Sequence, residues 1–347
     1  MASAHPLRPL RFLLATTAAL LALAPMAGSV PLARAADPEG SGPDCAVKGK
    51  GVVEKGVLIW NAKDGGTAIA GFATQEVTLE VSDFPADTSG RAKVKTGKGS
   101  GSVRIEGWVD PTKLPYSAKA DLTVVAEHVW IGRGEPVKWR GSSPGKVHVD
   151  TTLAATSQKL KAKGSCSQLA IGKVSPDDHE FPKDAKRWVL KSTSVDVYGE
   201  PSGSVVFTIE VPSAESGVLL WSTETKGIFV RVRHQGAFGL DAWAKLSELK
   251  AFPKGEMLDA LSTSSMVSIS PAKLKVEGAT KEVKVTKDVP LRLSANDTAK
   301  AIGVIEDGAD VIVVDTMAGW SRVFPKNLEI IPPDGKDFWA KASDLGL

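Results

Sequence analysis

The sequence lacks most of the features that an enzyme needs. Its 347 residues include only two Cys and five His. The histidines (5, 128, 148, 179 and 234) stand singly, without the spacing of a metal cage or a catalytic triad. Gly-x-Ser-x-Gly, Walker and dinucleotide motifs are absent as well. These absences predict a non-catalytic protein without a metal or cofactor.

Residues 1–35 have the pattern of a secretory signal peptide. Two arginines precede an uncharged apolar run, 12–24, and Ala33-Arg34-Ala35 supplies the small-x-small pattern that signal peptidase recognises. The run is shorter than the roughly 20 residues that a membrane span needs. We therefore expect cleavage before Ala36, no membrane span afterwards, and a periplasmic or extracellular protein.

The charge of the remaining chain is balanced. The signal segment carries three Arg and no acidic residue, so 40 basic and 40 acidic residues follow it. This balance argues against a nucleic-acid partner, which would need a basic surface. Two short basic stretches remain, 91–98 and 159–163. A solvated face is the ordinary interpretation of such stretches, and contact with an anionic polymer is the alternative.

Cys45 and Cys166 are predicted to form a disulfide. An exported chain with two cysteines most simply joins them in an oxidising compartment. The alternative, a reactive Cys nucleophile, would need a nearby His, and no local pattern supplies one. The bond would make residues 45–169 one folded unit.

The rest of the chain predicts a mainly β fold. Short runs rich in β-branched residues lie between Gly, Pro, Asn and Asp, and helical periodicity is scarce. Such runs occur at 57–60, 205–211, 229–233 and 311–315. Many short strands favour small barrels or sandwiches. Polar segments with Pro or Gly, 173–187 and 261–281, are expected to be linkers.

One nine-residue phrase occurs twice, as DAWAKLSEL (241–249) and DFWAKASDL (337–345). An aromatic-x-Arg-Val tetrad precedes each copy, starting at Phe229 and Trp320. A fainter third copy ends in GWVDPTKL (107–114). In all three endings a Trp precedes a Leu by six residues. This common spacing indicates a shared packing role, and residues 118–169 are either a degenerate fourth copy or an extension of the first.

These repeats resemble the bacterial SH3 (SH3b-type) domains of exported and cell-wall-associated proteins. The last copy carries the resemblance best, from an opening strand at 291–293 through GWSRV (319–323) to the closing phrase. The resemblance implies tandem small SH3-like β-barrels. We expect an N-terminal β domain with a divergent SH3-like repeat at 45–170, an SH3-like barrel at 186–250, a linker at 251–281 and a second SH3-like barrel at 282–347.

The resemblance also implies a peptide groove beside the opening strand. The groove candidates are Tyr198, Phe229, Trp320, Arg322 and Trp339. Core closure is the competing role for the Trp of each closing phrase, since a barrel of about sixty residues has little interior to fill. Trp130 and Trp139 are a further pair that either forms an aromatic face or packs in the core.

We therefore expect an exported binding protein whose tandem domains recognise cell-wall (peptidoglycan) peptides or envelope proteins. The first alternative is a structural or assembly protein that binds envelope partners through strand edges. The second is a cell-wall hydrolase, which would need His128 or His148 to meet a carboxylate near a Cys outside a disulfide.

Overall fold

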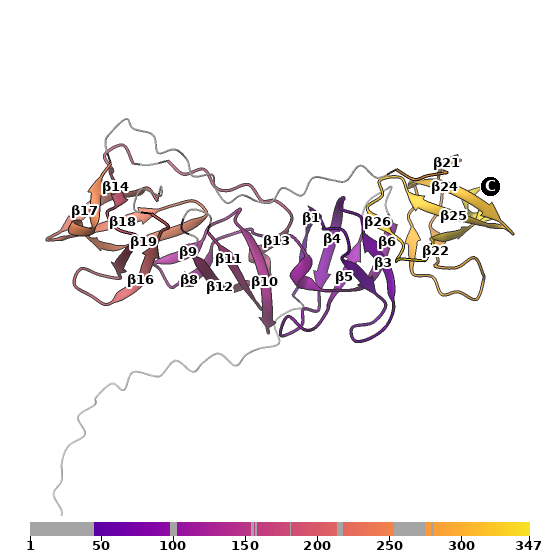
Figure 1. The fold of residues 1–347 in the computed structure, drawn as a ribbon, viewed down its shortest axis with the longest axis horizontal. Coiled ribbons are helices and arrows are strands. Elements are labelled where there is room, and N and C mark those ends of the chain that lie inside the picture. Colours follow the sequence, from indigo (N-terminus) through magenta and orange to yellow (C-terminus); the bar gives the residue numbers. More distant parts are fainter. Residues whose placement is uncertain are drawn as a thin grey trace, which may run out of the picture. The chain divides into compact units, whose positions relative to one another are not determined.

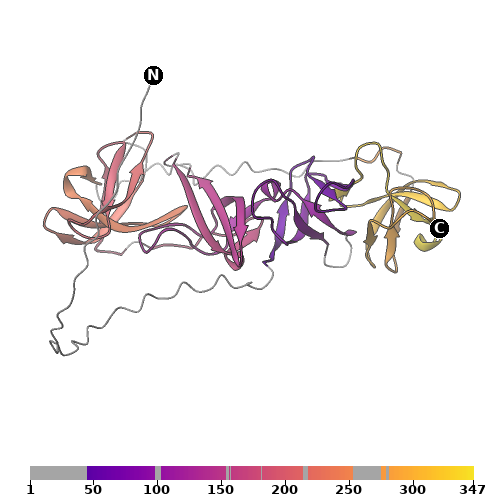
Figure 2. The same ribbon diagram turned by 90° about the horizontal axis from the view of Figure 1, so that it is seen from below.

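The computed structural model describes residues 45–97, 103–153, 156, 158–180, 182–213, 218–252, 275–278 and 281–347. The expected signal peptide and most of the expected linker 251–281 lie outside these residues. The regular structure of the described residues is almost all β-strand (Figures 1 and 2). Their helices are single 3-10 turns of three or four residues. The predicted mainly β fold is therefore confirmed.

The elements follow one order four times along the chain. Each unit has a first strand, a short hairpin, a three-stranded meander and a 3-10 turn. The first unit comprises β1 (Val47–Val52), β2 (Leu58–Trp60), β3 (Ala68–Phe72), β4 (Glu76–Ser82), β5 (Ala92–Thr96), β6 (Val103–Val109) and η1 (Pro111–Lys113). The second comprises β7 (Tyr116–Ala118), β8 (Leu122–Val125), β9 (Val129–Ile131), β10 (Pro136–Ser143), β11 (Lys146–Thr152), β12 (Lys159–Ser165), η2 (Cys166–Gln168) and the closing strand β13 (Leu169–Ile171).

The other two units repeat this order. The third comprises β14 (Lys186–Leu190), β15 (Ser194–Tyr198), β16 (Val205–Glu210), β17 (Leu220–Lys226), β18 (Phe229–His234), β19 (Phe238–Lys245), η3 (Leu246–Glu248) and β20 (Leu249–Ala251). The fourth comprises β21 (Lys281–Lys284), β22 (Val289–Leu291), β23 (Gly303–Ile305), β24 (Asp310–Met317), β25 (Trp320–Pro325), β26 (Ile330–Ile331), β27 (Trp339–Lys341) and η4 (Ala342–Leu345). The segment 118–169, left open by the sequence, thus has the element order of a further copy.

The strand pairings inside the units agree with this repetition. In each unit the first strand pairs antiparallel with the first meander strand: β1 with β4, β7 with β10, β14 with β17, and β21 with β24. Strands alternate buried and exposed residues, as β12 does along its whole length, so one face of each sheet packs into the core. A tight turn links β24 to β25. Ala318 and Gly319 both have positive φ between the paired residues Met317 and Trp320, the geometry of a type I′ hairpin.

The predicted barrels are not seen. The hydrogen-bonded strand order is open in each of the three described sheets, and none of them returns to its first strand. The reason is that short-hairpin strands pair outside their own unit. β9 of the second unit pairs with β19 of the third, and β23 of the fourth pairs with β6 of the first.

These contacts are reciprocal, because the hairpin of each unit has a neighbour in the other unit. The hairpin strand β3 of the first unit pairs with β26 of the fourth. The hairpin strand β16 of the third unit is bound by Gln158 of the second. The Gln158 side-chain amide donates to the Thr208 carbonyl (2.8 Å) and accepts from the Glu210 N–H (3.3 Å) on the edge of β16. A side-chain amide here takes the place of a neighbouring strand. The first and fourth units, and the second and third, are thus joined by backbone hydrogen bonds.

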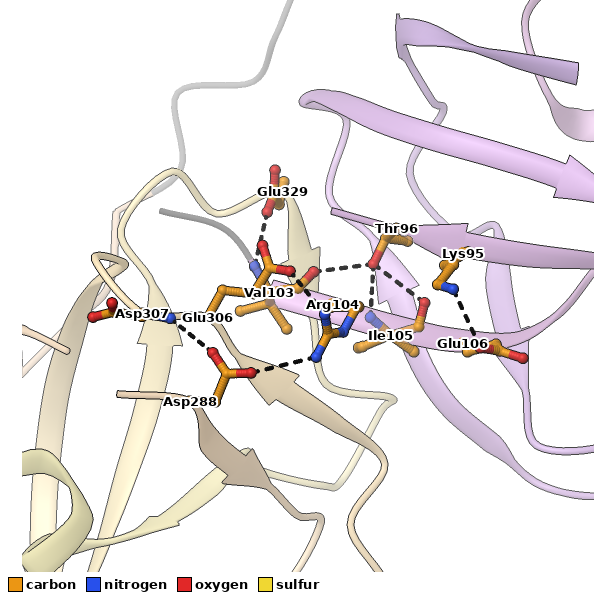
Figure 3. A network of polar contacts seen from close by, with 10 residues as sticks. All are labelled: Lys95, Thr96, Val103, Arg104, Ile105, Glu106, Asp288, Glu306, Asp307 and Glu329. Atoms are coloured by element: carbon orange, nitrogen blue, oxygen red, sulfur yellow. Dashed lines mark hydrogen bonds and ion pairs between the residues drawn. The ribbon is translucent and has the colours of Figure 1, made fainter. Parts of the chain in front are cut away.

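Polar contacts accompany the pairing of β6 with β23 (Figure 3). Arg104 forms ion pairs with Glu306 (3.3 Å) and Asp288 (3.4 Å). The Val103 N–H donates to the carboxylate of Glu329, a side chain that is only 6 % exposed. A buried carboxylate is costly when ionised, so this contact couples the pairing to pH.

The predicted disulfide between Cys45 and Cys166 is present, with Cα atoms 5.6 Å apart. It ties the start of the first unit to η2 of the second, where β1 also runs parallel to β13. The bond closes a loop with a sequence separation of 121 residues. By the chain-entropy argument, such a loop contributes about 5 kcal/mol to the free energy of unfolding.

Replacing both cysteines with Ala is therefore expected to lower the free energy of unfolding by up to about 5 kcal/mol. Urea unfolding followed by Trp fluorescence measures the change. Reductant should shift the unfolding of the native chain by the same amount and leave the double variant unchanged. An equal unfolding midpoint for the oxidised native chain and the variant would contradict a stabilising role.

Glu329→Gln tests the buried carboxylate. Burial raises the pKa of Glu329, with Glu306 adding to the effect, while the Val103 N–H, Asn327 and Lys50 oppose it. A folded-state pKa above the unfolded value makes ionisation unfavourable in the fold. The cost is absent at low pH and grows as pH rises through the two pKa values.

The Gln variant keeps an acceptor for Val103 and has no such cost. Its stability relative to the native chain should therefore rise as the pH increases above about 4, where an unfolded Glu begins to ionise. Urea unfolding across a pH series measures this difference. Glu282→Gln, at a carboxylate that is 62 % exposed, is the control and should show no such trend. A flat difference for Glu329→Gln would refute the assignment.

Candidate binding site: a repeated cation–aromatic face

The closing Trp of the repeated phrase occupies the same position in three units. It lies on the last meander strand, between a basic residue of the preceding strand and a residue of the short hairpin. In the third unit, Trp243 lies opposite Arg231 on one side and Tyr198 on the other. In the fourth unit, Trp339 lies between Arg322 and Arg292. Residues that lie opposite each other on paired strands project from the same side of the sheet, so these side chains form one face.

The first unit has the same arrangement. Trp108 pairs with Lys93 on β5 and with Trp60 on β2. We call each of these three sets a cation–aromatic face, defined by the closing Trp, the basic residue opposite it, the hairpin residue on its other side and the neighbouring cations. The second unit lacks the face because Lys163 stands six residues before Leu169, where the other units have Trp.

Each face contains an ion pair at the same place. The residue two positions before the closing Trp is acidic, and it binds the basic residue opposite that Trp. Lys93 pairs with Glu106, Arg231 with Asp241, and Arg322 with Asp337. Each pair thus joins the basic residue to the strand that carries the closing Trp.

The geometry of the pairs differs among the units. Arg231 donates to both carboxylate oxygens of Asp241, at 2.7 Å and 3.0 Å, and Arg233 adds a third hydrogen bond at 3.1 Å. The hydrogen bonds to Asp241 raise the pKa of Arg231. In contrast, the contact of Arg322 with Asp337 is 3.5 Å long. The Nε of Arg322 is buried and has no hydrogen-bond partner among the described residues.

Cations also lie over the aromatic rings. The Arg91 guanidinium is centred 4.0 Å from the Trp60 ring, and Lys245 Nζ lies 5.3 Å from the Tyr198 ring. Arg292 and Lys341 both approach the Trp320 ring, at 5.8 Å and 5.7 Å. Cation–π contacts of this kind are worth about 0.5–1 kcal/mol at exposed sites, so they position the cations without holding them firmly.

The groove candidates predicted from the sequence fall into two of these faces. Tyr198 and Phe229 contact each other edge to face, with ring centroids 5.5 Å apart. Trp320 and Arg322 lie two residues apart on β25, and Trp339 lies opposite Arg322 on β27. Phe229 and Trp320 are buried, 6 % and 7 % exposed, so their rings offer little surface to a ligand. Tyr198 and Trp339 are partly exposed.

Among the charged members of the faces, sequence reasoning selected Arg322 and missed the others. Asp241 and Lys245 stand at the first and fifth positions of the repeated phrase, as do Asp337 and Lys341 in the second copy. That repetition is a signal in the sequence, and it marks these charged positions as well as the Trp and Leu. Arg292 had no comparable signal, because its position is Tyr198 in the third unit and Trp60 in the first.

The other aromatic pair singled out from the sequence forms no face. Trp139 is fully buried and packs against Phe84, with ring centroids 5.9 Å apart. Trp130 covers Gly239 of β19, where any Cβ would lie within 2 Å of its indole ring. Both therefore serve packing, and the second holds β9 against β19.

The two histidines named for the hydrolase alternative have a backbone carbonyl and a Ser hydroxyl as polar neighbours. His128 Nδ1 lies 3.0 Å from the Asp241 backbone carbonyl, and His148 Nε2 lies 3.4 Å from Ser143. The described residues contain no group of three His, Cys, Asp or Glu that could hold a metal. Within the same residues, no helix is long and apolar enough to cross a bilayer.

Comparisons with protein-family models, with curated proteins and with solved structures found no match. The resemblance to bacterial SH3 domains therefore rests on the repeated residues of the sequence and stays a prediction.

Asp241→Asn and Asp337→Asn test whether the ion pair with the shorter contacts stabilises the fold more. The first removes the charge from three short hydrogen bonds and should cost about 1–2 kcal/mol of unfolding free energy, since such bonds are the strong class. The second weakens one long, half-exposed contact and should cost less than about 0.5 kcal/mol. Urea unfolding of the two variants side by side measures the difference. Equal losses would show that contact geometry does not set the strength of the pair.

Proposed function

We propose that this chain is an exported, non-catalytic binding protein built from tandem SH3-like units, and that its cation–aromatic faces bind cell-wall peptides. The observation that carries the proposal is the recurrence of the same face at the same strand positions in three units whose sequences otherwise differ. A single Trp on a strand is explained by packing. Packing alone gives no reason for three copies of a cation, an aromatic ring and an oriented ion pair.

The chemistry of the faces suits a peptide with carboxylates and short apolar side chains. Half-buried rings such as those of Trp108, Tyr198 and Trp339 offer flat apolar surface beside a cation. Neither Lys245 nor Arg292 is in an ion pair with any described residue, so each is available to a carboxylate. Cell-wall peptides combine these two kinds of group.

The alternative function, assembly with envelope partners through strand edges, needs strand edges that are free to pair. The hairpin strands β3, β9 and β23 already have a strand from another unit as a neighbour, and Gln158 covers part of β16. Strand addition by a partner protein would have to displace these contacts. The hydrolase alternative required a free thiol, and Cys45 and Cys166 are joined to each other.

Three weak faces on one chain act through effective concentration, so the whole protein binds a repetitive surface better than any one face does. Peptidoglycan is such a surface, because it presents the same peptide many times. Affinity for peptidoglycan then depends on how many faces bind at once, and it should fall stepwise as faces are removed.

Co-sedimentation with purified peptidoglycan sacculi tests the proposal. The full mature chain should pellet with sacculi at moderate salt. A triple variant, Lys63→Glu, Lys245→Glu and Arg292→Glu, reverses one cation per face; in the first face, Lys63 Nζ lies 5.6 Å from the Trp108 ring. This variant should reduce the bound fraction at least about tenfold, while each single change should reduce it less. The three side chains are surface cations, so the fold should tolerate the changes.

The matched control is Lys226→Glu, Lys250→Glu and Lys300→Glu, which makes the same change in net charge at exposed positions outside the faces. This control should pellet like the native chain. The proposal fails if the native chain stays in the supernatant at low salt, or if both triple variants lose binding equally.

A further inference from the structure

The second unit carries a basic face where the other units carry a cation–aromatic face. Its meander strands β10, β11 and β12 alternate buried apolar residues with residues on the opposite side of the sheet. Seven basic or imidazole side chains project from that outer side: Lys138, Arg140, Lys146, His148, Lys159, Lys161 and Lys163. The strand register places them in rows, since Lys163 lies opposite His148, and Lys161 lies opposite Asp150, which lies opposite Lys138.

Asp150 is the one acidic residue in these three strands, and it already binds two of the cations. It lies 3 % exposed beneath its neighbours, accepting from Arg140 Nε at 2.6 Å and from Lys159 Nζ at 3.0 Å. Burial by itself would raise the pKa of Asp150, but the hydrogen bonds from Arg140 and Lys159 outweigh it and lower the pKa. Asp150 therefore stays ionised and holds two of the cations in place.

The other four lysines of the face, at 138, 146, 161 and 163, are exposed. None of them forms an ion pair with a residue that the structure describes. The chain after residue 35 has equal numbers of basic and acidic residues, so this excess of positive charge is a local concentration. Like charges on adjacent strands repel and destabilise a sheet, and folding alone gives no reason to gather them.

The arrangement of the cations indicates the shape of the ligand. Lys159, Lys161 and Lys163 alternate along one strand, so their side chains are spaced by about 7 Å. Cations in such a row match the charges of an extended polymer rather than converging on one small anion. The outer side of the three strands presents no aromatic or large aliphatic residue to insert into lipid, which membrane-surface binding generally uses.

We propose that the outer face of β10, β11 and β12 binds a linear polyanion that carries phosphate groups along an extended backbone. This site is distinct from the cation–aromatic faces in position and chemistry. The second unit thus recognises fixed negative charge, whereas the other three recognise peptide.

Binding of the full mature chain to long-chain linear polyphosphate tests the proposal. The variant Lys146→Glu, Lys161→Glu and Lys163→Glu, which leaves the Asp150 ion pairs intact, should bind about 100-fold more weakly at low salt. The slope of log affinity against log salt should fall by about two to three, because that many phosphate contacts are lost. The three side chains are exposed and point away from the core, and circular dichroism checks that the variant folds.

Two matched variants separate this proposal from the previous one. The control Lys226→Glu, Lys250→Glu and Lys300→Glu should bind polyphosphate nearly as the native chain does. The variant Lys63→Glu, Lys245→Glu and Arg292→Glu should lose sacculi and keep polyphosphate. Equal losses in all three triple variants would overturn the basic face as the site, because net charge alone would then explain binding.

The ligand source is tested in parallel. Inorganic phosphate at the same phosphate concentration should compete poorly with the polymer, since it engages one cation at a time. Vesicles containing phosphatidylglycerol should bind more weakly than polyphosphate. Binding to vesicles without binding to polyphosphate, or full competition by inorganic phosphate, would overturn the polymer as the ligand.

Discussion

Backbone hydrogen bonding between units is the constraint on which the rest of the structure depends. A short hairpin leaves the outer edge of its second strand unpaired, and an exposed edge is costly and prone to unwanted pairing. Here β9 and β23 satisfy those edges on β19 and β6, strands that lie far away in sequence. As a consequence, the two ends of the last meander strand of the third unit, β19, pair with strands of different units. β19 pairs with a foreign strand at Phe238–Leu240 and with its own hairpin at Trp243.

That division determines where ligands are expected to bind. The half of the strand that pairs with its own hairpin also carries the closing Trp and its ion pair, so the backbone that holds the unit together also positions the cation–aromatic face. The second unit keeps the same backbone but has Lys163 at the Trp position. The scaffold is thus separable from the chemistry displayed on it, and one element order supports both a peptide-binding proposal and a polyanion-binding proposal.

Local features of the sequence were sufficient to predict individual strands and the disulfide. β-branched runs bounded by turn residues predicted strands such as β18 and β24, and the count of two cysteines predicted the disulfide. The sequence did not predict open sheets. Pairing of β23 with β6 joins residues about 200 positions apart, and no local pattern encodes it. The second unit was also ambiguous, because Lys163 replaces the Trp that marks the other copies and Gly141 interrupts the register of β10 with β11. Ligand identity, domain boundaries and export stay predictions.

The reciprocal pairing also has a consequence for the order in which the chain folds. Residues 103–105 of β6 are made early in synthesis, but their partner in β23 comes about 200 residues later. Until then the first unit has an open strand edge, while the second and third units can already pair. Contacts of such long sequence separation form slowly, and unpaired edges invite aggregation meanwhile. In the newly made chain, the first unit therefore has the greatest need of protection from aggregation until the last unit is complete.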